Sequence, residues 1–516
     1  MLLALGSRHG VLAIYNLKKY DGSICNWTPN VHSGDAITSI VNLPNSMKDS
    51  KLHFVTTGRD GSYSIFCLTG SKVNLLHRGT PPFGPMIEKA WFAGSDLVLC
   101  GFKSKNFIVW NETKQCEISS VECGGARRSY AYSPSGKDGA GNFIYTKASK
   151  LYLHSQRQPS HQIIKPGGHG REIKTAAVSP DGLIATGAED TVIRIWKYPD
   201  SPLTTEKHFE CLAVVEKHTT GIQRLQWHGT HYLFSSGGNE EFFVWAVESI
   251  PGFGIGVVFE ASCPDQSKEK DLRIMSFDVS SLSAFQDDCD RFLISLAYSD
   301  STIRVYTYSK DQGFRLVVGG RYTSSCLTQL QHREVRGHEL FMLTAATDGY
   351  LTVWKTTLSR QDGDRMSELV MLSNHLVHQS SIKALDIFTK DGRFVVATGG
   401  DDNALGITIY QAGDLDQKPQ RVIVRSAHAA AITGLSFIGN DRELRIVTSS
   451  NDQRVKDWSL TLGKSDPLEG LELRKTGDVF TSVADVGDVT TLTGGAGKAN
   501  KVLLVGNGME VYEVAC

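Results

Sequence analysis

Residues 167–198 (GGHGREIKTAAVSPDGLIATGAEDTVIRIWKY) combine three short β-prone runs with two turns, and this pattern constrains the fold more than any other feature. The first run, residues 173–178, is followed by Ser-Pro-Asp-Gly, a strong signal for a tight turn. The second run is residues 183–186, and another turn follows at residues 187–190. Residues 191–196 then alternate apolar and polar side chains, as a half-buried strand does. The segment therefore predicts a small antiparallel sheet.

The same strand–turn–strand pattern recurs along the chain and gives eleven units in all. The ten further units are residues 2–17, 53–68, 97–110, 142–155, 232–247, 292–308, 341–355, 394–411, 446–460 and 502–514. A Gly-His pair opens the unit at residues 167–198 and a Trp closes its last strand. This is typical of a WD-type propeller blade, a repeat of ~40–45 residues with four strands. We therefore predict an all-β chain built from WD-repeat β-propellers.

The number of units predicts two domains, because propellers usually have about four to eight blades. Residues 159–516 are predicted to form a closed seven-bladed propeller, in which residues 160–165 (SHQIIK) supply the outer strand that the last blade lacks. Residues 1–158 are predicted to form about four blades of another propeller, which starts inside a blade and is therefore incomplete or truncated at its N-terminus. The longer stretches between units are expected to be loops, namely residues 248–290, 308–340 and 356–377.

A bracket of polar side chains is predicted to hold each blade together. In residues 167–198 its members are His169, Thr186, Asp190 and Trp196, which can form one buried hydrogen-bonded cluster between the leading loop and two strands. We favour this structural role; a catalytic His-Asp-Thr set is the alternative. Further members of such brackets are expected at His218, Trp245, Asp348, Trp354, His428, Asp452 and Trp458.

Composition and motifs give no sign of a catalytic, metal-binding or membrane-spanning chain. The ten cysteines are scattered without metal-ligand spacing, which predicts reduced thiols in a cytosolic or nuclear protein, and we expect a cytoplasmic one. No signal peptide is recognisable, and no apolar run approaches the ~20 residues of a membrane span. The Gly-rich residues 494–498 and 252–256 lack the hydroxyl residue or the βαβ context of nucleotide-binding loops. We therefore expect no catalytic residues, no metal and no cofactor.

Charge is distributed unevenly, although the net charge is only −1. Residues 126–176 contain nine basic residues and two acidic ones, a balance of +7, with Tyr130, Tyr145 and Tyr152 interleaved. Cations neutralise phosphates and exposed rings stack on bases, so this stretch is a candidate RNA contact. The candidate RNA-binding residues are Arg127, Arg128, Lys147, Lys150, Arg157, Lys165, Arg171 and Lys174. The alternative is a solvated blade edge that pairs with residues 240–290, where eleven acidic residues outnumber three basic ones.

Several short motifs, taken in order, are more specific than a generic WD repeat. They are Cys123-Gly124-Gly125, Arg128-Ser129-Tyr130, His169-Gly170-Arg171-Glu172, Glu189-Asp190-Thr191, Ala345-Ala346-Thr347-Asp348-Gly349, His378-Gln379-Ser380, Ala427-His428, Asn451-Asp452-Gln453-Arg454-Val455 and Gly506-Asn507-Gly508-Met509-Glu510-Val511-Tyr512. Together they resemble the C-terminal part of the WD-repeat protein six family, from about residue 97 onward.

The resemblance implies a non-catalytic subunit of a tRNA methyltransferase complex. In that family a separate subunit binds S-adenosylmethionine and methylates the ribose 2′-hydroxyl of the first anticodon nucleotide, while the WD-repeat subunit helps to position the tRNA. The implied partners are a tRNA ribose methyltransferase and tRNA, with no membrane and no metal. A generic WD-repeat interaction platform, such as a ubiquitin-ligase adaptor or a trafficking factor, is the alternative, because the fold alone supports many partners. An enzyme that uses a propeller channel ranks third.

Overall fold

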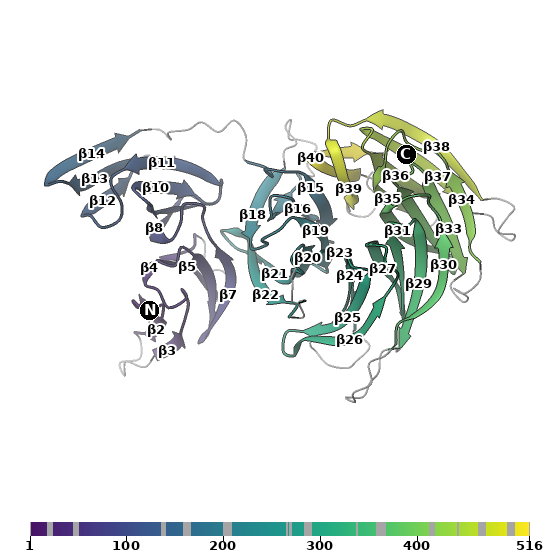
Figure 1. Cartoon of the computed structure of the whole chain (residues 1–516). Helices are drawn as coiled ribbons and strands as arrows, with labels where there is room; N and C mark the ends of the chain where they lie inside the picture. The colour runs from purple at the N-terminus through teal and green to yellow at the C-terminus, as the bar shows by residue number, and fades with distance from the viewer. Residues whose placement is uncertain are drawn as a thin grey trace. The chain divides into compact units, whose positions relative to one another are not determined.

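The computed structural model divides the chain into two compact units (Figure 1). It describes residues 2–17, 24–44, 51–135, 141–157, 167–199, 209–264, 267, 271–282, 291–336, 339–357, 368–411, 418–440, 443–462, 471–492 and 501–514. Unit 1 consists of Met1–Gly168, Cys211–Val215 and Ala246–Val258, and unit 2 consists of His169–Glu210, Glu216–Trp245 and Phe259–Cys516. In the described residues every regular element is a β-strand, so none of them forms a helix that could cross a membrane.

Four sheets lie wholly within unit 1 in its described residues, and they follow one another along the chain. The first sheet has strands β1 (Leu2–Gly6), β2 (Leu12–Asn16) and β3 (Ile24–Thr28). The second has β4 (Ile37–Asn42), β5 (Lys51–Gly58), β6 (Tyr63–Thr69) and β7 (Lys72–Gly79). The third has β8 (Met86–Ala93), β9 (Asp96–Lys103), β10 (Asn106–Asn111) and β11 (Cys116–Glu122). The fourth has β12 (Tyr130–Pro134), β13 (Gly141–Lys147) and β14 (Lys150–Gln156).

Three four-stranded sheets open the series that begins at β15, and each is antiparallel in chain order. The first has β15 (Ile173–Val178), β16 (Leu183–Ala188), β17 (Val192–Lys197) and β18 (Glu210–Glu216). The second has β19 (Ile222–His228), β20 (Tyr232–Gly237), β21 (Phe242–Ile250) and β22 (Gly254–Ser262). The third has β23 (Ile274–Ser281), β24 (Arg291–Tyr298), β25 (Thr302–Ser309) and β26 (Gly313–Arg321).

Three more four-stranded sheets and one two-stranded sheet complete the described part of unit 2. The fourth sheet has β27 (Leu327–Arg336), β28 (Glu339–Ala346), β29 (Tyr350–Thr357) and β30 (Val370–Leu376). The fifth has β31 (Ile382–Lys390), β32 (Arg393–Gly400), β33 (Leu405–Gln411) and β34 (Gln420–Val424). The sixth has β35 (Ile432–Asn440), β36 (Glu443–Ser450), β37 (Arg454–Thr461) and β38 (Glu472–Phe480). The last pairs β39 (Ala484–Leu492) with β40 (Lys501–Glu513).

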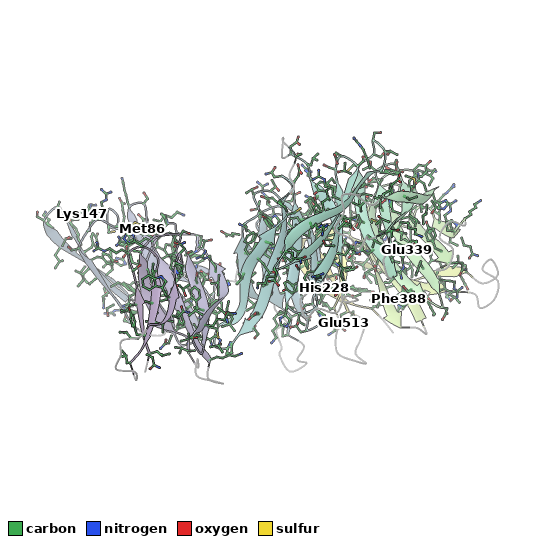
Figure 2. The ribbon with its side chains drawn as sticks, turned by 90° about the horizontal axis from the view of Figure 1, so that it is seen from below. Met86, Lys147, His228, Glu339, Phe388 and Glu513 are labelled. Atoms are coloured by element: carbon green, nitrogen blue, oxygen red, sulfur yellow. The ribbon has the colours of Figure 1, made fainter. Side chains whose placement is uncertain are left out.

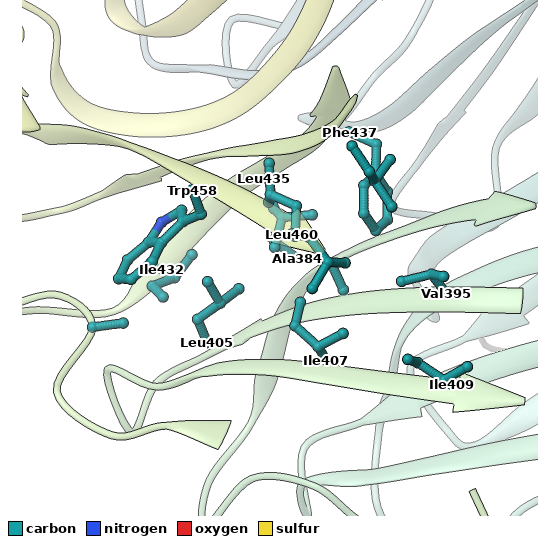
Figure 3. Close-up of a cluster of buried hydrophobic side chains, with 14 residues drawn as sticks. Ala384, Val395, Leu405, Ile407, Ile409, Ile432, Leu435, Phe437, Trp458 and Leu460 are labelled. Carbon is teal, nitrogen blue, oxygen red and sulfur yellow. The ribbon is translucent and has the colours of Figure 1, made fainter. Parts of the chain in front are cut away.

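Each of these small sheets buries its apolar faces against neighbouring sheets. Figure 3 shows one such core, in which Leu405 and Ile407 of β33 share a cluster with Ile432 and Leu435 of β35. Successive side chains of a strand point to opposite faces, so a central strand covered on both sides is apolar almost throughout. Burying one Leu or Ile side chain stabilises the fold by about 1.5–3 kcal/mol. A single sheet obtains this stabilisation only through its neighbours.

Hydrogen bonds also join the first strands of successive sheets in unit 2. From β15 to β27, each first strand is bonded to the next by Leu225 N–H to Thr175 Oγ1 (3.3 Å), Gln226 Nε2–H to Asp278 Oδ1 (2.7 Å) and Leu330 N–H to Ser276 Oγ (3.0 Å). From β27 to β39, the corresponding bonds are Thr328 Oγ1–H to the Ile382 carbonyl (2.6 Å), Phe437 N–H to Asp386 Oδ2 (2.8 Å) and Thr433 Oγ1–H to the Val486 carbonyl. A further bond returns to the start, because Ala176 N–H on β15 donates to Asp488 Oδ2 on β39 at 3.1 Å. The last sheet is therefore bonded to the first.

Three aspartates on first strands make these bonds in the same way. The carboxylates of Asp278, Asp386 and Asp488 each accept the N–H of the following residue and an N–H of the next sheet. Burial raises the pKa of Asp386, and it raises the pKa of Asp488 to about 6, although backbone hydrogen bonds and the positive charge of Arg224 oppose both shifts. The carboxyl groups of Asp386 and Asp488 are therefore easier to protonate than exposed ones.

The segment at residues 167–198 forms the sheet that its pattern predicts. β15 coincides with the predicted run at residues 173–178, β16 extends two residues past residue 186, and β17 begins one residue later than predicted. The loop between β17 and β18 is not fully described, but β18 pairs as the fourth strand of the sheet.

Two expectations are wrong. The three long stretches are not only loops, because they contain β22, β23, β26, β27 and β30. These are first and fourth strands of sheets, which the strand–turn–strand count did not include. The unit at residues 502–514 is one strand, β40, without the predicted turn. Gly508 has a φ of 126°, a conformation that L side chains rarely adopt, and this lets the strand continue past the Gly-Asn-Gly sequence. Residues 160–165, expected to complete the last blade, lie outside the described residues.

Asp488→Asn is expected to change how stability depends on pH. Because the pKa of Asp488 is raised to about 6 in the folded chain, the folded state binds the proton more tightly than the unfolded state between about pH 4 and pH 6. The wild-type chain should therefore lose stability as the pH rises through this range, by on the order of 2 kcal/mol from this group. Asparagine does not titrate, so the variant should lack that loss. Urea unfolding of the full chain at several pH values measures the difference, and parallel curves for the two proteins would contradict the expectation.

Candidate nucleic-acid interface

The structure brings the four bracket residues of the first sheet of unit 2 together. The His169 Nδ1 atom lies 3.0 Å from Asp190 Oδ2, and its Nε2 atom lies 2.7 Å from Thr186 Oγ1. Trp196 Nε1–H donates to the same Thr186 oxygen at 2.7 Å. A neutral imidazole fits both contacts, with Nδ1–H donating to the carboxylate and Nε2 accepting from the hydroxyl. Thr186 is fully buried, so its hydroxyl cannot reach a substrate, and this geometry supports the structural role.

Two other brackets have the same geometry. His428 contacts Asp452 and Thr448, and Trp458 Nε1–H donates to Thr448 at 3.0 Å. In the second sheet a glutamate replaces the aspartate: His218 Nδ1 lies 2.9 Å from Glu241 Oε2 and its Nε2 lies 2.7 Å from Ser235 Oγ. Trp245 Nε1–H donates to Ser235 at 2.9 Å. Thr448 and Ser235 were not among the predicted bracket residues, although each lies ten residues before the Trp of its sheet.

Elsewhere the bracket is present with other side chains. Asp348 accepts from Tyr322 Oη–H at 3.1 Å, and Trp354 Nε1–H donates to Thr344 at 2.8 Å, so a tyrosine takes part where the other brackets have a histidine. Two further brackets lack the Trp, although each keeps its histidine, carboxylate and threonine: they are His378, Asp402 and Thr398, and His32, Asp60 and Thr56.

The pKa values in the brackets reflect their hydrogen bonds. Burial alone would raise the pKa of Asp190 and Asp452, but hydrogen bonds from the histidine and from backbone N–H groups hold both values below the ordinary one. Glu241 is shifted downward for the same reason. Burial lowers the pKa of His218 and His428 despite the neighbouring carboxylates. The carboxylates therefore stay ionised and these two histidines favour the neutral form.

Four of the candidate RNA-binding residues lie at one edge of unit 1. Lys147 and Lys150 are cross-strand partners on either side of a two-residue turn. Arg128 Nη1–H donates to the Thr146 carbonyl at 3.3 Å, which fixes the loop that carries Arg127 beside this turn. Figure 2 shows Lys147 at the end of unit 1.

Two lysines that the sequence analysis missed belong to the same edge. The N–H groups of Cys123 and Gly124 donate to the Lys105 carbonyl at 3.0 and 2.8 Å, so the β9–β10 turn adjoins the loop before β12. Lys103 begins that turn. We call these six cations the basic edge: Lys103, Lys105, Arg127, Arg128, Lys147 and Lys150. No carboxylate among the described residues lies within ion-pair distance of them.

The other candidates lie elsewhere. Arg157 follows β14 at the end opposite to Lys150, since Gln156 pairs with Gly141. Arg171 and Lys174 belong to unit 2, where Lys174 Nζ lies 2.8 Å from Glu172 and 3.2 Å from Glu189. Lys165 lies outside the described residues. The basic stretch of the sequence is thus divided between separate places.

Three of the acidic residues at 240–290, Glu240, Glu241 and Glu260, have partners among the described residues of unit 2. Glu241 belongs to a bracket, and Glu240 accepts the Ser267 N–H at 2.9 Å. Glu260 accepts from Tyr308 Oη–H at 2.8 Å and lies 3.2 Å from Lys310 Nζ. These carboxylates are satisfied without the basic edge.

An exposed aromatic ring lies close to the basic edge. Tyr152, two residues after Lys150, stacks on Tyr145 with ring centroids 5.3 Å apart and an interplanar angle of 12°. Tyr152 remains 40% exposed, whereas Tyr145 is buried. Cations beside an accessible ring suit a nucleic-acid strand whose bases are unpaired. No group of three or more His, Cys, Asp or Glu in the described part of the chain could hold a metal ion.

Comparison with known proteins gives one family and several relatives. The family described as "WD domain, G-beta repeat" matches residues 160–197 and 369–407. Over 94% of its length the chain is 23% identical to the "tRNA (34-2'-O)-methyltransferase regulator WDR6" of Bos taurus and 24% identical to that of Homo sapiens, covering 50% and 49% of them. The Drosophila melanogaster protein of that name is 21% identical over 68% of the chain and 36% of its own length. The chain spans about half the length of the mammalian relatives it matches.

Asp452→Asn is expected to weaken the bracket in a pH-dependent way. The pKa of Asp452 is lowered in the folded chain, so its contribution to stability is complete above about pH 4 and is lost as the pH falls through the folded-state value. At neutral pH the variant should be less stable by about 2 kcal/mol, because the carboxylate accepts charge-assisted bonds. Urea unfolding of the full chain from pH 3 to pH 7 measures this. Asp485→Asn, at an exposed position, is the control and should follow the wild type; an unchanged Asp452→Asn chain would contradict the assignment.

Proposed function

The resemblance to the WD-repeat protein six family is confirmed by these matches, and from this premise we propose that the chain is a non-catalytic WD-repeat scaffold that helps to position tRNA for ribose 2′-O-methylation of the first anticodon nucleotide. The observation that carries the proposal is the similarity over 94% of the chain to proteins named as regulators of a tRNA 34-2′-O-methyltransferase. The methyl transfer itself belongs to a separate methyltransferase, which binds S-adenosylmethionine. The complex works in the cytoplasm.

The fold proposed for this role has two parts. Residues 159–516 form a closed seven-bladed propeller, and residues 1–158 form about four blades of a partial one. Two features support closure of the larger part: its described residues make seven successive sheets, and the hydrogen bond from Ala176 to Asp488 links the first sheet with the last. Closure by pairing removes a free sheet edge and leaves loops and rims for recognition.

The basic edge is proposed to contact the tRNA backbone. Its six cations are free of carboxylates among the described residues, so their charge is available to phosphates. Tyr152 offers a partly exposed ring beside them, on which an unpaired base can stack. In the anticodon loop the bases are unpaired, which suits a surface that combines cations with a ring.

Deletion of the gene is expected to abolish 2′-O-methylation at nucleotide 34 of the tRNAs that carry it. The partner would remain present but would lack its scaffold. Mass spectrometry of purified tRNA measures the modification, and re-expression of the full chain is the control, since it should restore the methyl group. Intact methylation in the deletion strain would remove the proposed function.

Charge reversal of the basic edge is expected to weaken tRNA binding. The triple change Arg127→Glu, Lys147→Glu and Lys150→Glu should lower the slope of log affinity against log salt by about two or more, since each lost phosphate contact accounts for about 0.7–0.9. Filter binding or fluorescence anisotropy across salt concentrations measures the slope. The matched control reverses three exposed cations of unit 2 that are not candidate RNA-binding residues, Arg321, Lys418 and Arg425, and should bind as the wild type does. Equal losses in both triple variants would refute a dedicated RNA contact.

A further inference from the structure

The fourth sheet of unit 1 has a free third strand in the part that the structure describes. Its order is β12-β13-β14, which leaves β14 at the edge. In the two preceding sheets the third strand has a fourth beside it, because β6 pairs with β7 and β10 pairs with β11. Among the described residues, no strand occupies the fourth place in this sheet.

Side-chain exposure sets β14 apart from the equivalent strands. Leu151 and Leu153 are 72% and 66% exposed, whereas Ile108 and Val109 of β10 are 5% and 0% exposed. Every residue of β14 except Gln156 is exposed, whereas every residue of β6 except the last is buried. β14 thus carries apolar side chains of the kind that neighbouring strands and sheets cover elsewhere in unit 1.

The backbone of β14 presents hydrogen-bonding groups at regular intervals. Ala148 and Ser149 form the turn before it, with φ values of 48° and 60°, as in a type I′ hairpin. In such a hairpin the residues that flank the turn exchange hydrogen bonds, and bonded pairs then alternate with non-bonded ones. The N–H and C=O groups of Leu151, Leu153 and Ser155 therefore point away from β13. These are the groups that a docking strand needs.

Charge around this edge is entirely of one sign. No carboxylate occurs in the described residues of the fourth sheet, residues 130–135 and 141–157, whereas Lys150 begins β14 and Arg157 follows it. A strand with acidic side chains complements these cations, and apolar side chains between them cover Leu151 and Leu153.

We propose that β14 is the docking edge for an extended strand of the methyltransferase partner, a strand whose apolar and acidic residues alternate and which completes the sheet as its fourth member. The identity of the partner rests on the proposed function. The docking mode rests on the edge position of β14, on its exposed leucines and on its outward backbone groups.

Hydrogen exchange of individual amides tests the docking directly. The probe is the tRNA 2′-O-methyltransferase that co-purifies with the full chain, and exchange is compared between the free chain and the complex. Exchange at Leu151, Leu153 and Ser155 should be fast in the free chain and slow at least tenfold in the complex. Tyr152 and His154 bond to β13 and should be protected in both samples.

A proline variant separates backbone pairing from side-chain packing. Leu153→Pro removes an outward N–H that β13 does not use, so the sheet tolerates it as an edge strand tolerates proline. It should weaken capture of the methyltransferase about tenfold, and clearly more than Leu153→Ala, which keeps the N–H. Exchange at Tyr152 and His154 shows whether each variant retains the hairpin.

The other outcomes are informative in different ways. Protection of Leu151 and Leu153 already in the free chain means that the chain covers its own edge, and protection by tRNA alone means that RNA is the occupant; either result overturns the docking. A methyltransferase that binds without protecting β14 overturns the docking and leaves the proposed function intact. If no methyltransferase co-purifies, the proposed function fails and the partner assignment fails with it.

Discussion

A small sheet cannot cover its own two faces, and this constraint shapes every part of the structure. Each strand is five to thirteen residues long, so one sheet alone buries too little apolar surface to be stable. Packing between sheets supplies the missing burial, as in the core around Leu405 and Ile432. Hydrogen bonds between first strands then fix how neighbouring sheets align, and the aspartates Asp278, Asp386 and Asp488 do this with carboxylates that each satisfy two backbone N–H groups.

The brackets join residues within one sheet, and they explain why the repeat can be recognised in the sequence. A histidine, a hydroxyl residue, a carboxylate and a Trp must meet in one buried cluster, and the strand and turn lengths fix their spacing. The hydroxyl oxygen therefore lies ten residues before the Trp in four sheets: Thr186, Ser235, Thr344 and Thr448. In two brackets a different residue type makes the same hydrogen bond: Glu241 replaces an aspartate, and Tyr322 takes the place of a histidine.

The sequence predicted the strands and brackets well because both depend on residues close together in the chain. It predicted long-range features less well. The first and fourth strands in the stretches taken as loops, such as β22 and β27, are less apolar or lack a bracket residue, so the repeat count missed them. The basic stretch was treated as one surface, yet Lys150 and Arg157, at opposite ends of β14, lie about 20 Å apart at ~3.3 Å per residue. The stretch also continues into another unit. Lys103 and Lys105 join the basic edge only through tertiary contacts.

The two proposed contacts of unit 1 meet at its fourth sheet but use different parts of it. The basic edge lies at the β13–β14 turn, the β9–β10 turn and the loop before β12, where side chains project beyond the strand ends. The docking edge runs along β14, where backbone groups and leucines are uncovered. A strand that pairs with β14 leaves the turn accessible, apart from Lys150, which belongs to both. An acidic residue placed against Lys150 would therefore compete with RNA phosphate for a single cation of the six, so the two proposed contacts are compatible at a small electrostatic cost.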